Sequence, residues 1–206
     1  MRLIFIVIGW LLPQVLLAQF NSFEPGSYVL HNSPTVRHQS SLKFQGGDEF
    51  MVKDANGNRR KLTVSEVSSF RIGPQKYIAV GRFAVGSGLR NSYVERAFVA
   101  QVDSGRVGLL FYEYDVYAGL TSFGASDKQI KHLYLLQKEF RMFPIPNHGS
   151  LDNKTFRAAL SPHLQERPDM IKLLEEKRMC FNDMPLVVRA LNTGQPMPTL
   201  PTYWNR

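Results

Sequence analysis

Apolar and polar residues alternate through most of the chain from Ser27 to about Phe143, as they do in β-strands that bury one face. The clearest case is residues 49–64, EFMVKDANGNRRKLTV, in which two alternating stretches flank the pair Asn56-Gly57. An Asn-Gly pair between such stretches predicts a β-hairpin. The apolar positions on its buried face are Phe50, Val52, Leu62 and Val64.

The rest of this region predicts a series of further strands. Turn signals separate them, including Gly73-Pro74 and the loop Asp103-Ser104-Gly105. Several short strands with no helical pattern among them predict an antiparallel β-sandwich or a partly open barrel. The predicted strands cover residues 27–31, 35–44, 67–72, 76–85, 93–102, 106–117, 131–140 and 141–143.

From about residue 152 the spacing of apolar residues changes to that of helices. The fold class is therefore α+β: an antiparallel β-sandwich or partly open barrel followed by a short C-terminal helical segment. We expect one domain over residues 19–192 and an extended or disordered proline-rich tail over residues 193–206. The predicted helices cover residues 152–164, 167–179 and 182–192, with start signals at Asp152, at Pro168 and at Asn182 or Asp183.

The first eighteen residues have the order of a secretory signal peptide. Arg2 precedes an apolar run from Leu3 to Leu17, and the small residue Ala18 marks the expected cleavage site. This run of 15 residues is shorter than the roughly 20 that a membrane-spanning helix needs; a retained membrane anchor is the alternative. We predict an exported protein, in the periplasm, at the outer membrane or outside the cell, with no transmembrane span in the mature chain.

The mature chain is basic. Without Arg2, 24 lysine and arginine residues stand against 17 acidic residues, a net charge of +7. On an exported protein this charge favours anionic partners such as lipid headgroups or acidic polysaccharides. Nucleic acid is not an expected partner, because export separates the chain from it. The alternative is that the charge only keeps the protein soluble.

The densest positive patch falls on the predicted hairpin. Arg59, Arg60 and Lys61 are consecutive, and Lys53 faces them across the turn. These four residues are the candidate patch for an anionic envelope surface. The alternative is a solvated strand whose like charges discourage pairing between sheet edges, which is the more common role of a charged run.

Residues 103–119, DSGRVGLLFYEYDVYAG, contain the main candidate for ligand binding. Burial explains most of this run without a ligand, because one face of the strand is entirely apolar or aromatic: Leu110, Tyr112, Tyr114 and Val116. The other face begins with Leu109 and Phe111 and then turns acidic. Its later residues are a candidate ligand groove, in which a ring stacks on a sugar and carboxylates accept its hydroxyls; they are Glu113, Asp115 and Tyr117.

The sequence carries no recognisable catalytic or metal-binding motif. Cys180 is the only cysteine, so an intramolecular disulfide is excluded and a small buried thiol is expected. We predict no catalytic residue, no metal and no cofactor; Glu113, Asp115 or a histidine would be the candidates in a hydrolase. The histidines lack the spacing of metal ligands, and they are His31, His38, His132, His148 and His163.

Four stretches together resemble a family of secreted proteins, without an assigned activity, that is common in Bacteroidota. They are FEPGSYVL, FMVKDANGNRRKLTVSEVSSFRIGPQKYIAV, FVAQVDSGRVGLLFYEYD and TFRAALSPHLQERPDMIKLLEEKRMCFNDMPLVVRALN. The family pattern has a signal peptide, a β-rich body with a glycine-marked loop before an aromatic strand, and a helical segment that ends in an asparagine, here Asn192. The resemblance implies export and a single α+β domain, and it carries no cofactor or site residue over to this chain.

Three functions are compatible with these patterns. The first is a non-catalytic exported protein with a binding or structural role at the bacterial cell envelope, whose partner is an anionic envelope component or another envelope protein. The second is a periplasmic or extracellular hydrolase that acts on a glycan or peptide, which predicts a deep pocket with at least two ionisable groups of shifted pKa. The third is a module that binds a partner at an exposed sheet edge.

Overall fold

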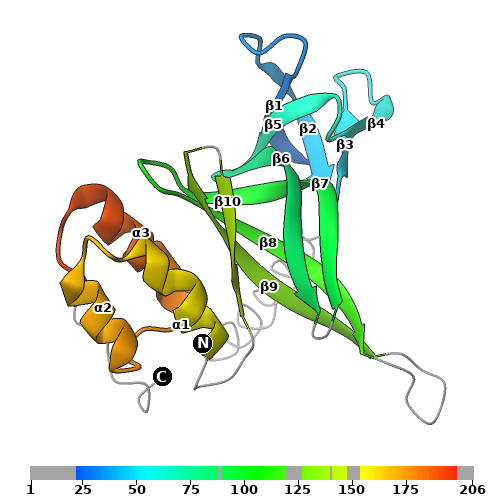
Figure 1. Cartoon of the computed structure of the whole chain (residues 1–206). Helices are drawn as coiled ribbons and strands as arrows, with labels where there is room; N and C mark the ends of the chain where they lie inside the picture. The colour runs from blue at the N-terminus through cyan, green and yellow to red at the C-terminus, as the bar shows by residue number, and fades with distance from the viewer. Residues whose placement is uncertain (1–21, 88–89, 119–126, 140, 148–153, 199–206) are drawn as a thin grey trace, which may run out of the picture.

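The computed structural model describes residues 22–87, 90–118, 127–139, 141–147 and 154–198. Its ten strands form one antiparallel sheet in the order β10-β9-β8-β7-β6-β5-β1-β2-β3-β4, and three short helices follow at the C-terminus (Figure 1). This arrangement confirms the predicted α+β class. The strands are β1 (Glu24–Leu30), β2 (His38–Phe44), β3 (Glu49–Lys53), β4 (Arg59–Thr63), β5 (Val67–Ile72), β6 (Gln75–Ser87), β7 (Arg90–Asp103), β8 (Gly108–Ala118), β9 (Asp127–Lys138) and β10 (Arg141–Pro146); the helices are α1 (Lys154–Leu160), α2 (Pro168–Glu175) and α3 (Met184–Thr193).

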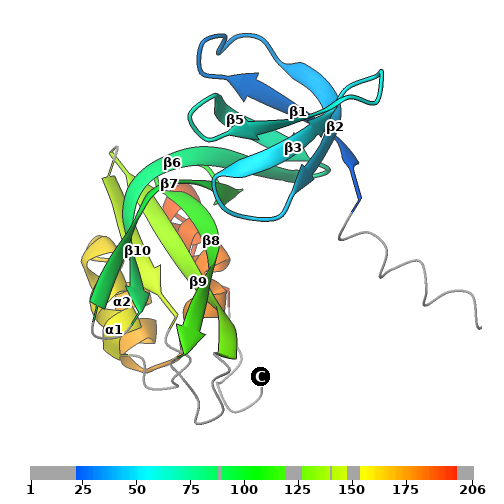
Figure 2. The same cartoon turned by 90° about the vertical axis from the view of Figure 1, so that its right-hand side faces the viewer.

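The hairpin of β6 and β7 belongs to both halves of the sheet (Figure 2). Ala79 and Phe98 pair across it and point to one face, which we call face 1; they pack with the N-terminal half, β1–β5. The next pair, Val80 and Ala97, points to the opposite face, face 2, and packs with the C-terminal half, β8–β10. Because the two halves pack on opposite faces of the same hairpin, the sheet curls in opposite directions on either side of it.

The N-terminal half curls over face 1 and encloses an aromatic core. Its centre is Phe70, which is 2% exposed. The turn between β2 and β3 reaches across to β7, where the amide of Phe98 donates a hydrogen bond to the carbonyl of Gly47 at 3.0 Å. Four rings lie around Phe70 at centroid distances of 5.1, 4.3, 4.7 and 5.0 Å, and they belong to Phe44, Phe50, Tyr77 and Phe98.

The C-terminal half uses both faces of the sheet. Face 2 is buried by the curl of β6–β10 around Leu110, Leu133 and Leu135. Face 1 of β8–β10, which carries Leu109, Leu136 and Ile145, is covered by the helices. The helical side chains that bury it include Phe156, Leu160, Met170, Leu174, Met184, Val187 and Val188. Face 1 is therefore covered at one end by the N-terminal half and at the other by the helices.

Two polar side chains hold the helices in place. The Asn192 amide bonds both backbone groups of Val107 before β8: its Oδ1 accepts from the Val107 amide at 2.8 Å and its Nδ2 donates to the Val107 carbonyl at 2.9 Å. The Arg167 guanidinium donates to both carboxylate oxygens of Asp169, and to the carbonyls of Ala190 and Gln195. This pairing lowers the pKa of the Asp169 carboxyl.

The helix starts agree with the sequence signals in part. Pro168 is the first residue of α2, as predicted. Asp183 does precede α3, but its carboxylate does not cap that helix. It accepts a hydrogen bond from the Cys180 amide at 2.8 Å and so closes the short 3-10 turn that leads into α3.

The two edge strands differ in how they discourage pairing with another sheet. β4 carries the exposed charges of Arg59, Arg60 and Lys61. β10 extends through Pro144 and Pro146, three residues beyond the predicted end of the strand at Phe143. Proline has no amide hydrogen to donate, so it is tolerated in an edge strand where it would not be in a central one. The predicted strand, residues 141–143, ends before these prolines.

Some sequence predictions concern residues outside the described part of the chain. These include the signal peptide, residues 1–18, and the end of the tail beyond residue 198. The described part of the tail, residues 194–198, contains neither helix nor strand. None of the helices in the described ranges is both long enough and apolar enough to cross a membrane.

Candidate functional site

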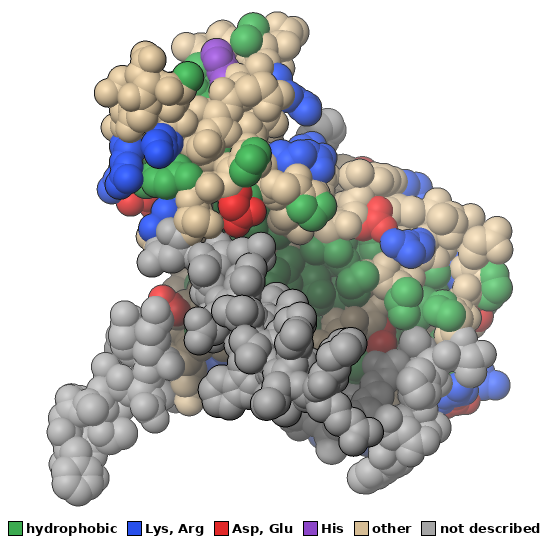
Figure 3. All heavy atoms as spheres, turned by 180° about the vertical axis from the view of Figure 1, so that it is seen from behind, with side chains coloured by type: hydrophobic (Ala, Val, Ile, Leu, Met, Phe, Trp, Pro, Cys, Tyr) green, Lys and Arg blue, Asp and Glu red, His purple; other side chains and the backbone are tan. Residues whose placement is uncertain are grey.

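A hollow of about 720 Å³ lies on face 1, in the strip that neither the N-terminal half nor the helices cover. From behind the molecule, hydrophobic side chains are visible in a depression below the N-terminal half (Figure 3). We call this hollow the groove. Its described lining residues are Phe44, Gln45, Gly46, Gly47, Tyr77, Phe98, Ala100, Phe111, Tyr112, Glu113, Tyr114, Asp115 and Ile130.

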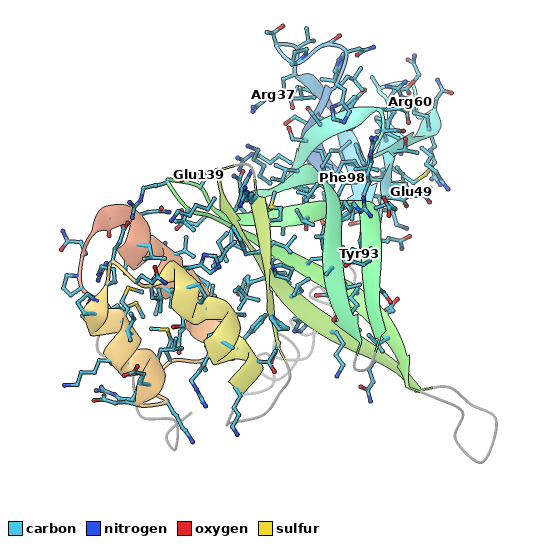
Figure 4. All side chains as sticks on the ribbon, viewed as in Figure 1. Arg37, Glu49, Arg60, Tyr93, Phe98 and Glu139 are labelled. Atoms are coloured by element: carbon cyan, nitrogen blue, oxygen red, sulfur yellow. The ribbon has the colours of Figure 1, made fainter. Side chains whose placement is uncertain are left out.

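One wall of the groove is the turn between β2 and β3. Gly46 and Gly47 both have positive φ, +96° and +87°, which few residues other than glycine adopt without strain. The bond from the Phe98 amide to the Gly47 carbonyl fixes this turn against β7 (Phe98 is labelled in Figure 4). The wall therefore offers peptide groups and small residues, and it is anchored to the sheet that forms the floor.

The floor is the part of face 1 formed by β7, β8 and β9. Ala100 and Phe111 pair across β7 and β8. Ile130 on β9 pairs with Asp115, four residues further along β8, and has 58% of its surface exposed. Phe111 is half-buried, and its ring lies 5.3 Å from that of Tyr134, which continues into the core under the helices. The half-buried ring of Phe111 and the exposed Ile130 are two apolar surfaces on the same face that a ligand could cover.

The rim of the groove is acidic. Glu113 and Asp115 are both exposed and stand on the same face of β8. The Glu113 carboxylate lies 3.6 Å from Nε2 of His132 on the neighbouring strand. No lysine or arginine occurs among the described lining residues, although the whole chain has 25 of them and a net charge of +8. The groove thus differs in charge from the rest of the protein.

Three tyrosines that line the groove, Tyr77, Tyr112 and Tyr114, have a raised pKa. Burial raises the pKa of the Tyr77 phenol, and the carboxylates of Glu113 and Glu24 raise it further. Burial is also the main cause of the raised pKa of Tyr112. The rings of Tyr112 and Tyr114 pack on face 2, where Tyr112 meets Phe83 at 5.0 Å. All three phenols therefore stay protonated at neutral pH.

The predicted ligand residues have different outcomes. Glu113 and Asp115 border the groove together, as expected from their place on one face of the strand. Tyr117 is part of β8 and pairs with Lys128, but its side chain lies outside the described residues. That these residues bind a ligand stays a prediction. The sequence reading missed the contributions from β2, β6 and β7, although the Gly46-Gly47 pair was a visible signal for a special turn.

The predicted basic patch is divided between the two faces of the sheet edge. Lys53, Arg59 and Lys61 share one face, because Lys53 pairs with Arg59 and residues 59 and 61 alternate with Arg60. The Lys61 ammonium forms a salt bridge with the Glu49 carboxylate at 2.7 Å. The Arg60 guanidinium donates a hydrogen bond to the Tyr28 hydroxyl at 2.9 Å (Glu49 and Arg60 are labelled in Figure 4). These contacts suit a charged edge strand, and binding of an anionic surface by this patch stays a prediction.

Cys180 and the histidines lie in separate places. Cys180 is buried, as expected for a small thiol. In the described part of the chain, no three histidine, cysteine, aspartate or glutamate side chains gather in a way that could hold a metal ion. His148 lies outside that part. His31 contacts the Val64 carbonyl, and His38 stacks on the ring of Tyr28. His132 lies next to Glu113, and His163 contacts the ring of Phe143.

Searches of protein-family models, of curated proteins and of solved structures found no match to this chain. The resemblance to secreted proteins of Bacteroidota therefore stays a prediction. The case for a function depends on the geometry of the groove and on the charges around it.

Proposed function

We propose that the protein is an exported, non-catalytic binding protein of the bacterial cell envelope and that the groove binds a glycan. The observation that carries this proposal is the composition of the groove: aromatic and apolar side chains on the floor, two carboxylates at the rim, and no basic residue among the described lining residues of a chain with net charge +8. Its volume of about 720 Å³ falls in the range of small-molecule sites.

A glycan suits these groups better than an anion does. A sugar ring has apolar C–H faces that can lie on Phe111 or on Ile130, and hydroxyl groups that can donate to the carboxylates of Glu113 and Asp115. An anionic ligand would meet repulsion from the same carboxylates without a basic partner in the described lining. The envelope location comes from the predicted signal peptide, and a bacterial envelope is rich in polysaccharides.

Binding without hydrolysis is favoured by the position of the carboxylates. Glu113 and Asp115 are two residues apart on one strand, so both stand on the same side of the groove. Glycoside hydrolysis needs two carboxyl groups on opposite sides of the scissile bond. The Glu113 side chain is also 58% exposed, whereas a general acid usually owes its raised pKa to burial. A hydrolase therefore remains the second hypothesis.

The test is a binding measurement on the mature chain, residues 19–206. The probes are chitohexaose, cellohexaose, xylohexaose and maltohexaose, each titrated by isothermal calorimetry. We expect at least one of them to bind, and we expect the double variant Glu113→Gln/Asp115→Asn to bind it about tenfold more weakly, because hydrogen bonds to charged acceptors are lost.

The matched control removes the same charge elsewhere. Glu95→Gln/Glu139→Gln also neutralises two exposed carboxylates, and neither residue lines the groove. We expect this control to keep the affinity of the unmodified protein. Equal weakening in both double variants would contradict a site at the groove. If none of the sugars bound while hexalysine bound and lost affinity with Glu113→Gln/Asp115→Asn, the ligand class would be a cationic peptide and the glycan proposal would be wrong.

A further inference from the structure

A second hollow, of about 330 Å³, adjoins the groove and shares two residues with it, Phe44 and Tyr77. It lies at the start of β1, between β2 and the turn from β5 to β6, and Glu24, Lys43 and Gln75 border it. Phe44 and Tyr77 therefore stand at the border of the two hollows, and we call this pair the ridge. We propose that the glycan is a linear oligosaccharide that crosses this ridge and occupies both hollows; this inference rests on the function proposed above.

Packing fixes the positions of the two rings of the ridge. The rings of Phe44 and Tyr77 meet at a centroid distance of 4.8 Å and an angle of 63°, so they pack edge to face. Both rings also lie against the buried Phe70, at 5.1 and 4.7 Å. Each residue is only partly buried and lines both hollows, while the contact with Phe70 fixes the position of its ring. A fixed aromatic ridge is a stacking platform for a sugar ring at little cost in side-chain entropy.

Acidic groups stand on both sides of the ridge. Glu113 borders the groove and Glu24 borders the second hollow. Both carboxylates are near enough to the Tyr77 phenol to raise its pKa. A chain of sugar units across Tyr77 would therefore find hydrogen-bond acceptors at each end and a protonated phenol between them. A single sugar ring could use only one of these two sets of groups.

The inference predicts how affinity depends on ligand length. A disaccharide fits in the groove alone, and longer chains add contacts in the second hollow until both are filled. Units joined in one chain pay the entropic cost of association only once, so affinity rises with each unit that gains contacts. We expect affinity to rise at least about tenfold between the disaccharide and the hexasaccharide and then to level off.

The experiment combines this length series with a change in the second hollow. The probes are the oligomers of one to six units of the four sugars named above. The variant Glu24→Gln/Lys43→Ser should bind the hexasaccharide about fivefold more weakly and should bind the disaccharide within about twofold of the unmodified protein, because two contact residues are removed from one hollow only. The control, Glu175→Gln/Lys154→Ser, makes the same chemical changes on the exposed helical surface and should leave both affinities unchanged.

The outcomes separate the two proposals. Equal affinity for the disaccharide and the hexasaccharide, or an equal effect of Glu24→Gln/Lys43→Ser on both lengths, would overturn the linear-ligand inference while glycan binding by the groove stood. Failure of every sugar to bind would overturn the proposed function and this inference with it.

Discussion

The two halves of the sheet bury the same face by different means. The N-terminal half covers face 1 by curling over it, with Phe70 at the centre of a cluster of rings. The C-terminal half curls the other way, and its face 1 is covered by helices that follow the sheet in sequence. Neither cover extends over the strip of face 1 between them, where Glu113, Asp115 and Ile130 are exposed. The groove is that strip, so it results from the change in curl at β6 and β7.

The largest effect should come from breaking the cover of the N-terminal half. Phe70→Ala removes a buried ring that contacts four others, and we expect it to lower the free energy of unfolding by about 3–5 kcal/mol. Urea denaturation followed by far-ultraviolet circular dichroism measures this change. The comparison is Phe143→Ala, whose ring is only partly buried against the helices and should cost clearly less. If both variants lowered the free energy of unfolding equally, the ring cluster of the N-terminal half would contribute no more to stability than the packing of the helices on the sheet.

Most of the strands could be predicted because their signals are local. The hairpin at Asn56-Gly57 follows from a turn that only a few residue pairs favour, and β5 has the predicted bounds of residues 67–72. Alternation along β8 also gave the correct two faces: Leu110 and Leu109 are both fully buried, and exposure begins at Glu113 on one face only. Local pattern cannot, however, say what covers a face, so the role of the helices over Leu109 could not be predicted.

The groove could be predicted only in part for the same reason. Glu113 and Asp115 lie on one strand, and their common face follows from the spacing of two residues. Their partners in the lining come from positions distant in sequence, such as Phe44, Tyr77 and Ile130. The order of the strands and the change in curl bring these lining residues together. Both depend on which strands pair with each other, and the alternation of apolar and polar residues does not specify that pairing. The same limit applies to Pro144: alternation does not show that this residue lies in an edge strand, where a missing amide hydrogen is tolerated.

A smaller effect should come from the attachment of the helices to the sheet. A Cβ atom at Gly105 would lie 2.6 Å from the Asn192 side chain, which bonds Val107. Asn192→Ala removes two hydrogen bonds and should lower the free energy of unfolding by about 1–3 kcal/mol. Gly105→Ala should cost a similar amount because the new methyl group displaces the same amide.

The double variant of these two residues tests whether they act at one contact. Once Asn192 is alanine, the methyl group at residue 105 has no amide to displace, so Gly105→Ala/Asn192→Ala should cost no more than Asn192→Ala alone. Urea denaturation of the four proteins gives the coupling free energy. Additive losses would show that glycine is required at residue 105 for another reason. The contact would also account for the glycine-marked loop and the terminal asparagine of the resemblance described above.

The smallest effect should appear in the pH dependence of stability between about pH 7 and pH 5, and it should come from His163 in the half that the helices cover. Burial lowers the pKa of the His163 imidazole, and the charge of Lys138 lowers it further. In the unfolded chain the pKa returns to about 6.5, so below that pH the unfolded state binds a proton that the folded state does not. Stability should therefore fall as the pH drops from about 7 towards 5, by less than about 1 kcal/mol because the ring is only partly buried. His163→Gln should flatten this part of the profile, and Lys138→Met should reduce its slope by relieving the repulsion of the imidazolium. If His163→Gln left the pH dependence of the free energy of unfolding unchanged, a group other than His163 would be responsible for it. The half under the helices would then not differ from the N-terminal half in this respect.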